Sequence, residues 1–189
     1  MDRDIRVAVI VGSTREGRFG STVARWFTRH AGRRDDLELD VIDLADTPLP
    51  DAIGGDAPDG FDEYLQRLDR ADAFVVVTPE YNHGYPGTLK HAIDLAKRQW
   101  QAKPVAFVSY GGLSGGLRSV EQLRLVFAEL HATTVRDVVS LHNPWDFFDD
   151  DGRMVADVGA EEAADVMLDR LLWWARALAE AREAVAYAA

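Results

Sequence analysis

The feature that most constrains the fold is a series of short apolar runs, each followed by a loop and then by a segment with helical periodicity. Residues 7–11 and 73–77 are continuous apolar runs with the length of one buried strand. Residues 104–110 and 133–141 are expected to form further strands. Residues 37–43 alternate apolar with acidic side chains, which is typical of a strand nearer the edge of a sheet.

Helical patterns fill the intervals between these strands. The first helix is expected to follow Ser21 and Thr22, either of which can cap it, and the others cover residues 60–71, 88–96, 117–130 and 160–186. Strands and helices that alternate in this way predict an α/β fold with three layers, in which a doubly wound five-stranded parallel sheet is covered on both faces. No repeat or linker interrupts the pattern, so we expect one domain over residues 1–189.

The loop after the first strand, residues 12–20, is polar and rich in glycine. Backbone N–H groups at the start of the next helix, together with nearby hydroxyl and guanidinium groups, suit a phosphate. The loop lacks the Lys and Ser/Thr of a nucleoside-triphosphate loop, because Arg18 and Phe19 follow Gly17. Ser13 and Thr14 break the dinucleotide-binding pattern. The loop therefore predicts a terminal phosphate site, as for a mononucleotide, with an ordinary strand–helix turn as the alternative.

Charge and composition exclude several classes of function. The net charge of −11 argues against broad binding to nucleic acids or anionic membranes. The absence of cysteine excludes disulfides, thiolate metal sites and thiol catalysis, and the histidines lack metal-ligand spacing. No apolar run reaches the length of a membrane span and the N-terminal apolar run is short for an export signal, so we expect a cytoplasmic protein.

Two further loops lie where the carboxyl ends of strands should meet, which is where doubly wound sheets bind ligands. Residues 79–90 read PEYNHGYPGTLK, and residues 110–116 read YGGLSGG. Together with GSTR at 12–15 and the Ser21-Thr22 pair, these segments resemble the NADPH-dependent FMN reductases of flavodoxin-like fold, a group that includes azo-dye, quinone and chromate reductases. The segment at 79–90 is the most specific of the three, and the resemblance covers roughly residues 5–185.

The resemblance implies that the first loop holds the FMN phosphate, the second lies against the isoalloxazine ring, and the third borders its pyrimidine side. It implies an oxidoreductase that passes hydride from NADPH or NADH through FMN to a flavin, quinone, azo compound or metal oxyanion in a ping-pong cycle. It also implies a homodimer or homotetramer, paired through the helices after the third and fourth strands. The cofactor-binding residues that it indicates are Ser13, Arg15, Gly20, Ser21, Thr22, Pro79, Glu80, Tyr81, Asn82, Tyr110, Gly111 and Gly112.

These residue types suit the roles chemically. Tyr81 offers an amphipathic surface to a flat ring and Asn82 can hydrogen-bond its edge. Gly111 and Gly112 allow the backbone to approach closely. Glu80 is expected to have a structural role within its loop rather than to act as an acid or base.

Several alternatives remain at this point. His83 is either a plain loop residue or a proton donor. Residues 145–148 form either a packed aromatic cluster or a wall over a flavin, and packing is preferred. Trp173 is expected to lie in the core, and Trp174 is expected to lie half-buried at the surface.

Two rival functions also remain. One is a serine hydrolase, because residues 112–116 match Gly-x-Ser-x-Gly and Ser114 is followed by Asp137 and His142. In that segment we expect Ser114 to cap the next helix instead. The other rival is a flavodoxin-like electron carrier without its own NAD(P)H activity.

Overall fold

A single parallel sheet organises the computed structural model, which describes residues 4–156 and 158–187. Its strand order is β2-β1-β3-β4-β5, and every pairing is parallel. The strands are β1 (Ile5–Val11), β2 (Leu37–Asp43), β3 (Ala73–Pro79), β4 (Pro104–Gly111) and β5 (Thr133–His142). This order and the helices between the strands confirm the predicted flavodoxin-like α/β fold, and β2 lies at an edge as its alternating pattern indicated. Residues 1–3 and 188–189, the ends of the expected domain, lie outside the described residues.

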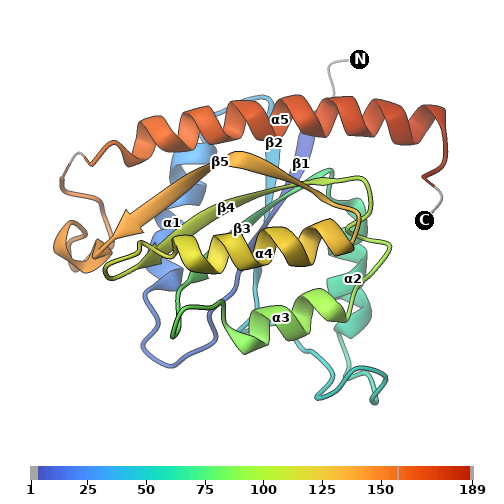
Figure 1. The fold of residues 1–189 in the computed structure, drawn as a ribbon, viewed down its shortest axis with the longest axis horizontal. Helices are drawn as coiled ribbons and strands as arrows, with labels where there is room; N and C mark the ends of the chain where they lie inside the picture. The colour runs from blue at the N-terminus through green and yellow to red at the C-terminus, as the bar shows by residue number, and fades with distance from the viewer. Residues whose placement is uncertain (1–3, 157, 188–189) are drawn as a thin grey trace.

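Helices cover the sheet on both faces, so the fold has three layers (Figure 1). The helices are α1 (Gly20–Ala31), α2 (Phe61–Arg70), α3 (Gly87–Asp94), α4 (Leu117–Glu129) and α5 (Ala160–Ala184). Alternate residues of β1 serve the two cores: Val7 and Val9 pack with α1 and α5, whereas Ala8 and Ile10 pack with α2, α3 and α4. Burial on both faces explains why the central strands are apolar without interruption.

Helix α1 does not begin as predicted. It starts at Gly20, with Phe19 in the N-cap position, and no side chain of the described residues caps it. Phe19 already has helical dihedral angles (φ −82°, ψ −11°), whereas a capping serine or threonine needs an extended backbone. Ser21 and Thr22 therefore lie inside the first turn, and the prediction that they cap the helix is wrong.

Helix α4 begins at Leu117 with Gly116 in the N-cap position, so Ser114 is not its cap either. Gly116 has a left-handed backbone (φ +85°), and a Cβ there would lie 2.8 Å from the backbone nitrogen of Tyr110. Strand β3 ends at Thr78 and Pro79, as predicted, and these two residues pair with Ser109 and Tyr110.

The aromatic residues near the C-terminus divide into packed and exposed groups. Phe147 and Phe148 pack against the core shared by α1 and α5, as predicted, but Trp145 is 55% exposed. Trp173 was expected in the core and is 62% exposed. The buried positions of this part of α5 are Leu171, Leu172 and Ala175, and their stripe excludes Trp173, which lies on the outer face of the helix.

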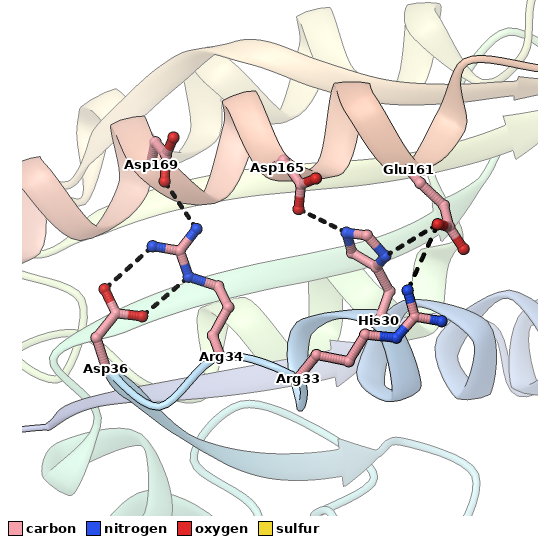
Figure 2. Close-up of polar contacts among 7 residues, drawn as sticks. All are labelled: His30, Arg33, Arg34, Asp36, Glu161, Asp165 and Asp169. Atoms are coloured by element: carbon pink, nitrogen blue, oxygen red, sulfur yellow. Dashed lines mark hydrogen bonds and ion pairs between the residues drawn. The ribbon is translucent and has the colours of Figure 1, made fainter.

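Ion pairs fasten the C-terminal end of α1 to α5. His30 Nε2 lies 2.7 Å from Asp165 Oδ1, and its Nδ1 lies 3.7 Å from Glu161 (Figure 2). Just beyond the helix, Arg34 binds Asp36 and Asp169. We call this set of residues, with Arg33, the α1–α5 clasp.

Candidate functional site

The carboxyl ends of three adjacent strands bring the three predicted loops together. β3 lies between β1 and β4, so the loops that follow Val11, Pro79 and Gly111 are neighbours (Figure 1). The N–H of Gly12 donates to Val77 O (2.9 Å), and the N–H of Glu80 donates to Tyr110 O (3.2 Å). Segments nearly 100 residues apart in the chain thus share one edge of the sheet, which we call the rim.

Side chains of the first loop meet those of the second. Ser13 is buried, and its hydroxyl lies 2.7 Å from the hydroxyl of Tyr81. The Arg15 guanidinium lies 5.9 Å from the centroid of the Tyr81 ring, and Thr14 donates to Thr88 at 3.3 Å. The loop is therefore held against the β3 loop, while Arg15 is exposed.

Two buried polar groups without hydrogen-bond partners lie at the start of α1. A Cβ on Gly20 would lie 2.6 Å from the Tyr110 hydroxyl, so only glycine fits there without movement. That hydroxyl and the Nε of Arg18 are both buried, and neither has a hydrogen-bond partner within the described chain. Burial, and next the neighbouring Tyr81, raise the pKa of Tyr110 above its usual range, while the nearby Ser13 hydroxyl, and then Arg18 and Arg15, oppose this. A neutral hydroxyl donor beside helix N–H groups and guanidinium groups fits an anion, so this part of the rim suits an FMN phosphate.

Ser21 and Thr22 lie in the same first turn of α1 and are partly buried. The Thr22 hydroxyl accepts a hydrogen bond from Arg25 (3.2 Å), so it is engaged on the outer side of the helix. Arg18 is turned toward β2, where its Nη2 lies 2.5 Å from Asp43.

The second loop is a tight turn whose shape is fixed by the backbone. Tyr81 and Gly84 exchange two N–H···O bonds (2.8 and 3.1 Å), and Asn82 and His83 between them have φ of +51° and +72°. Positive φ at both central residues is the type I′ pattern. The Ser119 hydroxyl of α4 lies within hydrogen-bond distance of the carbonyls of Pro79 (2.9 Å) and Gly84 (2.7 Å), and sharing its one hydrogen between them ties the loop to α4. His83 is exposed at the tip, and its carbonyl accepts from Gln122.

Glu80 turns away from the loop tip toward α4. Its carboxylate accepts from the Ser114 hydroxyl (2.5 Å) and from the N–H of Arg118 (3.2 Å), and it pairs with the Arg118 guanidinium (3.1 Å). The Glu80 side chain is only 9% exposed. These contacts support the structural role that we expected for Glu80, and they fasten the β3 loop to the β4 loop.

The third loop allows close approach of the backbone. Gly111 accepts the N–H of Asn143 at 2.7 Å, and the Asn143 side chain faces Gly112. Asn143 has φ of +47°, and sequence reasoning missed it, although Asn-Pro at 143–144 is a turn signal. A Cβ on Gly115 would lie 2.4 Å from Ser140 Oγ, which explains the glycine there.

The hydrogen bonds at Ser114 do not build a hydrolase triad. Ser114 is bound to Glu80, while His142 lies 3.2 Å from both Leu113 O and Ser140 Oγ. Asp137 pairs with Arg136 at 3.8 Å. Each member of the proposed triad therefore faces a different neighbour.

Features away from the rim offer no comparable site. A cavity of about 650 Å³ lies beside β2 and α2, but its Arg6 and Arg67 are paired with Glu38 and Asp40. Within residues 4–156 and 158–187, no group of three acidic or histidine side chains could hold a metal ion. Among the helices described, none combines the length and apolarity needed to cross a bilayer.

Comparison with known proteins gives a consistent result. A family model described as NADPH-dependent FMN reductase matches residues 5–146. An NAD(P)H-dependent FMN reductase of Schizosaccharomyces pombe is 38% identical over 120 residues, which is 59% of this chain and 60% of that protein. A quinone reductase of Pseudomonas putida is 32% identical over 164 residues, covering 82% of this chain and 87% of the relative.

Solved structures agree with these sequence matches. The structure of FerB, a flavoenzyme NAD(P)H:(acceptor) oxidoreductase from Paracoccus denitrificans, superimposes with a TM-score of 0.72 at 25% identity. The match covers 91% of this chain and 98% of FerB.

Proposed function

The chain belongs to the NADPH-dependent FMN reductase family, and we propose that it carries reducing equivalents from NAD(P)H through FMN to a small flat acceptor, with quinones as the leading class. Membership of this family makes the protein an FMN-dependent oxidoreductase, so the hypothesis of an electron carrier without NAD(P)H activity is not retained. FMN supplies the hydride and electron chemistry, and no nucleophilic side chain is required.

On the phosphate side, we propose that Ser13, Arg15 and the amides at Gly20 and Ser21 hold the FMN phosphate. The observation that carries this assignment is the buried Tyr110 hydroxyl, which faces Gly20 and lacks a partner in the described residues. A buried donor without an acceptor is unfavourable, so a ligand oxygen at this place relieves it. The Arg15 guanidinium nearby offsets the phosphate charge, whereas Arg18 is already paired with Asp43.

On the ring side, we propose that Pro79, Tyr81 and Asn82 line one face and that Gly111 and Gly112 border the pyrimidine edge. The type I′ turn holds Tyr81 and Asn82 in fixed positions, which favours a preorganised contact with a rigid ring. Glu80 contributes by fixing this loop to Arg118 rather than by contacting the ligand.

For the acceptor, we propose that NAD(P)H and a quinone use the same exposed face of the ring in turn, which gives ping-pong kinetics. The relatives named quinone reductase support this acceptor class. We also propose that the enzyme acts in the cytoplasm and forms a homodimer or dimer of dimers through α3 and α4. Exposed Leu117 and Leu125 on α4 support that surface.

Steady-state turnover of FMN-loaded protein with NADPH and benzoquinone tests the proposal. Parallel double-reciprocal lines across acceptor concentrations are expected. Intersecting lines would contradict the shared ring face, and absence of NAD(P)H oxidation with bound FMN would contradict the proposed function itself.

A further inference from the structure

A small hairpin beyond the family match packs on the phosphate side of the rim. Phe148 and Met154 form an antiparallel bridge, and the N–H of Val155 donates to Phe147 O at 2.9 Å. Asp149 closes the turn by accepting the N–H groups of Gly152 and Arg153. We call residues 147–155 the hairpin; the family model ends at residue 146.

The first contact of the hairpin is aromatic. Phe148 meets Phe19 edge-on, with ring centroids 5.6 Å apart, and meets Trp26 in the same way at 6.4 Å. Phe19 in turn lies 6.5 Å from the ring of Tyr110. Phe19 is therefore held between the hairpin and the tyrosine whose hydroxyl faces Gly20.

The second contact is a close approach of backbone to helix. Gly152 has φ of +68°, and a Cβ there would lie 3.2 Å from Thr22 Cγ2 and 3.4 Å from Arg25 Nη2. The turn of the hairpin thus rests on the first two turns of α1. A side chain at this position would press the turn away from the helix.

These contacts are important because the start of α1 lacks a side-chain N-cap. Phe19 occupies the N-cap position, and no side chain from the described part of the chain bonds to the free N–H groups there. Packing must therefore fix the residue that directly precedes Gly20. The hairpin supplies that packing from more than 100 residues away along the chain.

We propose that the hairpin is a positioning element of the cofactor site, which fixes the start of α1 and so prepares its N–H groups for the FMN phosphate. The inference rests on the proposed placement of that phosphate. Preorganisation of this kind strengthens binding by reducing the ordering that a ligand must impose. Because the hairpin acts on the phosphate side, its loss should weaken FMN far more than riboflavin, which lacks the phosphate.

The test is titration of apoprotein with FMN and with riboflavin, followed by flavin fluorescence. We expect F148A to raise the Kd of FMN about tenfold, through faster dissociation, and to change the Kd of riboflavin by less than about twofold. G152A should shift binding in the same direction, and F148L should restore part of the loss. V155A is the matched control, because Val155 lies on the hairpin but is 64% exposed, and its FMN Kd should stay within about twofold of the wild type.

Outcomes separate the two levels of the argument. An unchanged FMN Kd in folded F148A and G152A, or equal weakening of FMN and riboflavin, would overturn the role of the hairpin alone. If wild-type protein itself binds FMN no better than riboflavin, the phosphate assignment fails and the hairpin proposal fails with it. Should F148A not fold, F148L and G152A carry the same comparison, with far-UV circular dichroism as the check on folding.

Discussion

The polar groups at the two ends of helix α1 differ in the partners that the chain supplies. At the C-terminal end, His30, Arg33 and Arg34 all lie against carboxylates of α5 or of Asp36 (Figure 2). At the N-terminal end, the buried Tyr110 hydroxyl faces Gly20 without an acceptor among the residues described. Among the buried polar atoms of the clasp only His30 Nδ1 lacks a hydrogen bond, and it still lies 3.7 Å from Glu161, whereas no carboxylate or carbonyl of the described residues accepts from the Tyr110 hydroxyl at the rim.

Polar groups that are paired within the chain are interpreted as structural, and a buried group without a partner is a candidate for ligand binding. Cations at the end of a helix with carboxylate partners stabilise the fold and complement the helix dipole. A buried donor with no acceptor lowers stability, and a ligand that supplies the acceptor removes that cost. Changes at the rim should therefore alter binding, and changes at the clasp should alter stability alone.

The largest effect is expected from Gly20→Ala. The added Cβ would lie 2.6 Å from the Tyr110 hydroxyl and would displace it from the place proposed for the phosphate contact, so FMN affinity should fall about 100-fold. Gly87→Ala is the matched control, because Gly87 also opens a helix at this edge but a Cβ there meets no described atom within 4 Å. Fluorescence titration measures both, and wild-type affinity in the Gly20 variant would break the comparison.

The next largest effect is expected from Tyr110→Phe, which should raise the stability of the apoprotein and lower its affinity for FMN. Removing the buried hydroxyl should stabilise the apoprotein by about 1 kcal/mol, while FMN affinity falls about tenfold.

Tyr64→Phe is the control variant, because the Tyr64 hydroxyl is also buried but donates to Ala92 O at 2.9 Å. That variant should lose about 1 kcal/mol of stability and keep its FMN affinity. Urea unfolding with and without FMN measures both quantities, and a Tyr110 variant less stable than wild type without FMN would argue against an unsatisfied hydroxyl.

The smallest effect belongs to the clasp. The Arg34 guanidinium, and then Arg176, lower the pKa of Asp36 to about 2 from its ordinary 3.8. A carboxylate with a depressed pKa adds stability that is present above pH 3.8 and is lost as the pH falls through 2. Asp36→Asn should cost about 1 kcal/mol at pH 7, since the pair is partly exposed to solvent, and the difference from wild type should vanish toward pH 2. Thermal unfolding across pH measures this, and a change in FMN Kd for this variant would show that the two ends are coupled.

Much of the fold was predictable because each strand and helix has its own pattern of apolar residues in the local sequence. Continuous apolar runs such as residues 73–77 can only be buried on both faces, and the helices between them require parallel pairing. Gly20, Tyr81 and Gly111 could be assigned to one edge for the same reason. The type I′ turn at Asn82 and His83 depends on backbone angles that the sequence leaves open.

Contacts between distant segments were not predictable. The start of α1 was misplaced because Phe19 is held by Phe148 and not by a local cap. Trp173 was misassigned because the buried stripe of α5 excludes it, although a large apolar side chain favours burial. The pairing of Glu80 with Arg118 likewise depends on where α4 packs.

A crystal structure of the FMN complex would show most directly where the flavin binds. We predict a phosphate oxygen within hydrogen-bond distance of the Gly20 N–H and the Tyr110 hydroxyl, with the ring against Tyr81. A flavin bound in the cavity beside Arg6 and Arg67, with the rim closed by protein atoms, would contradict this prediction.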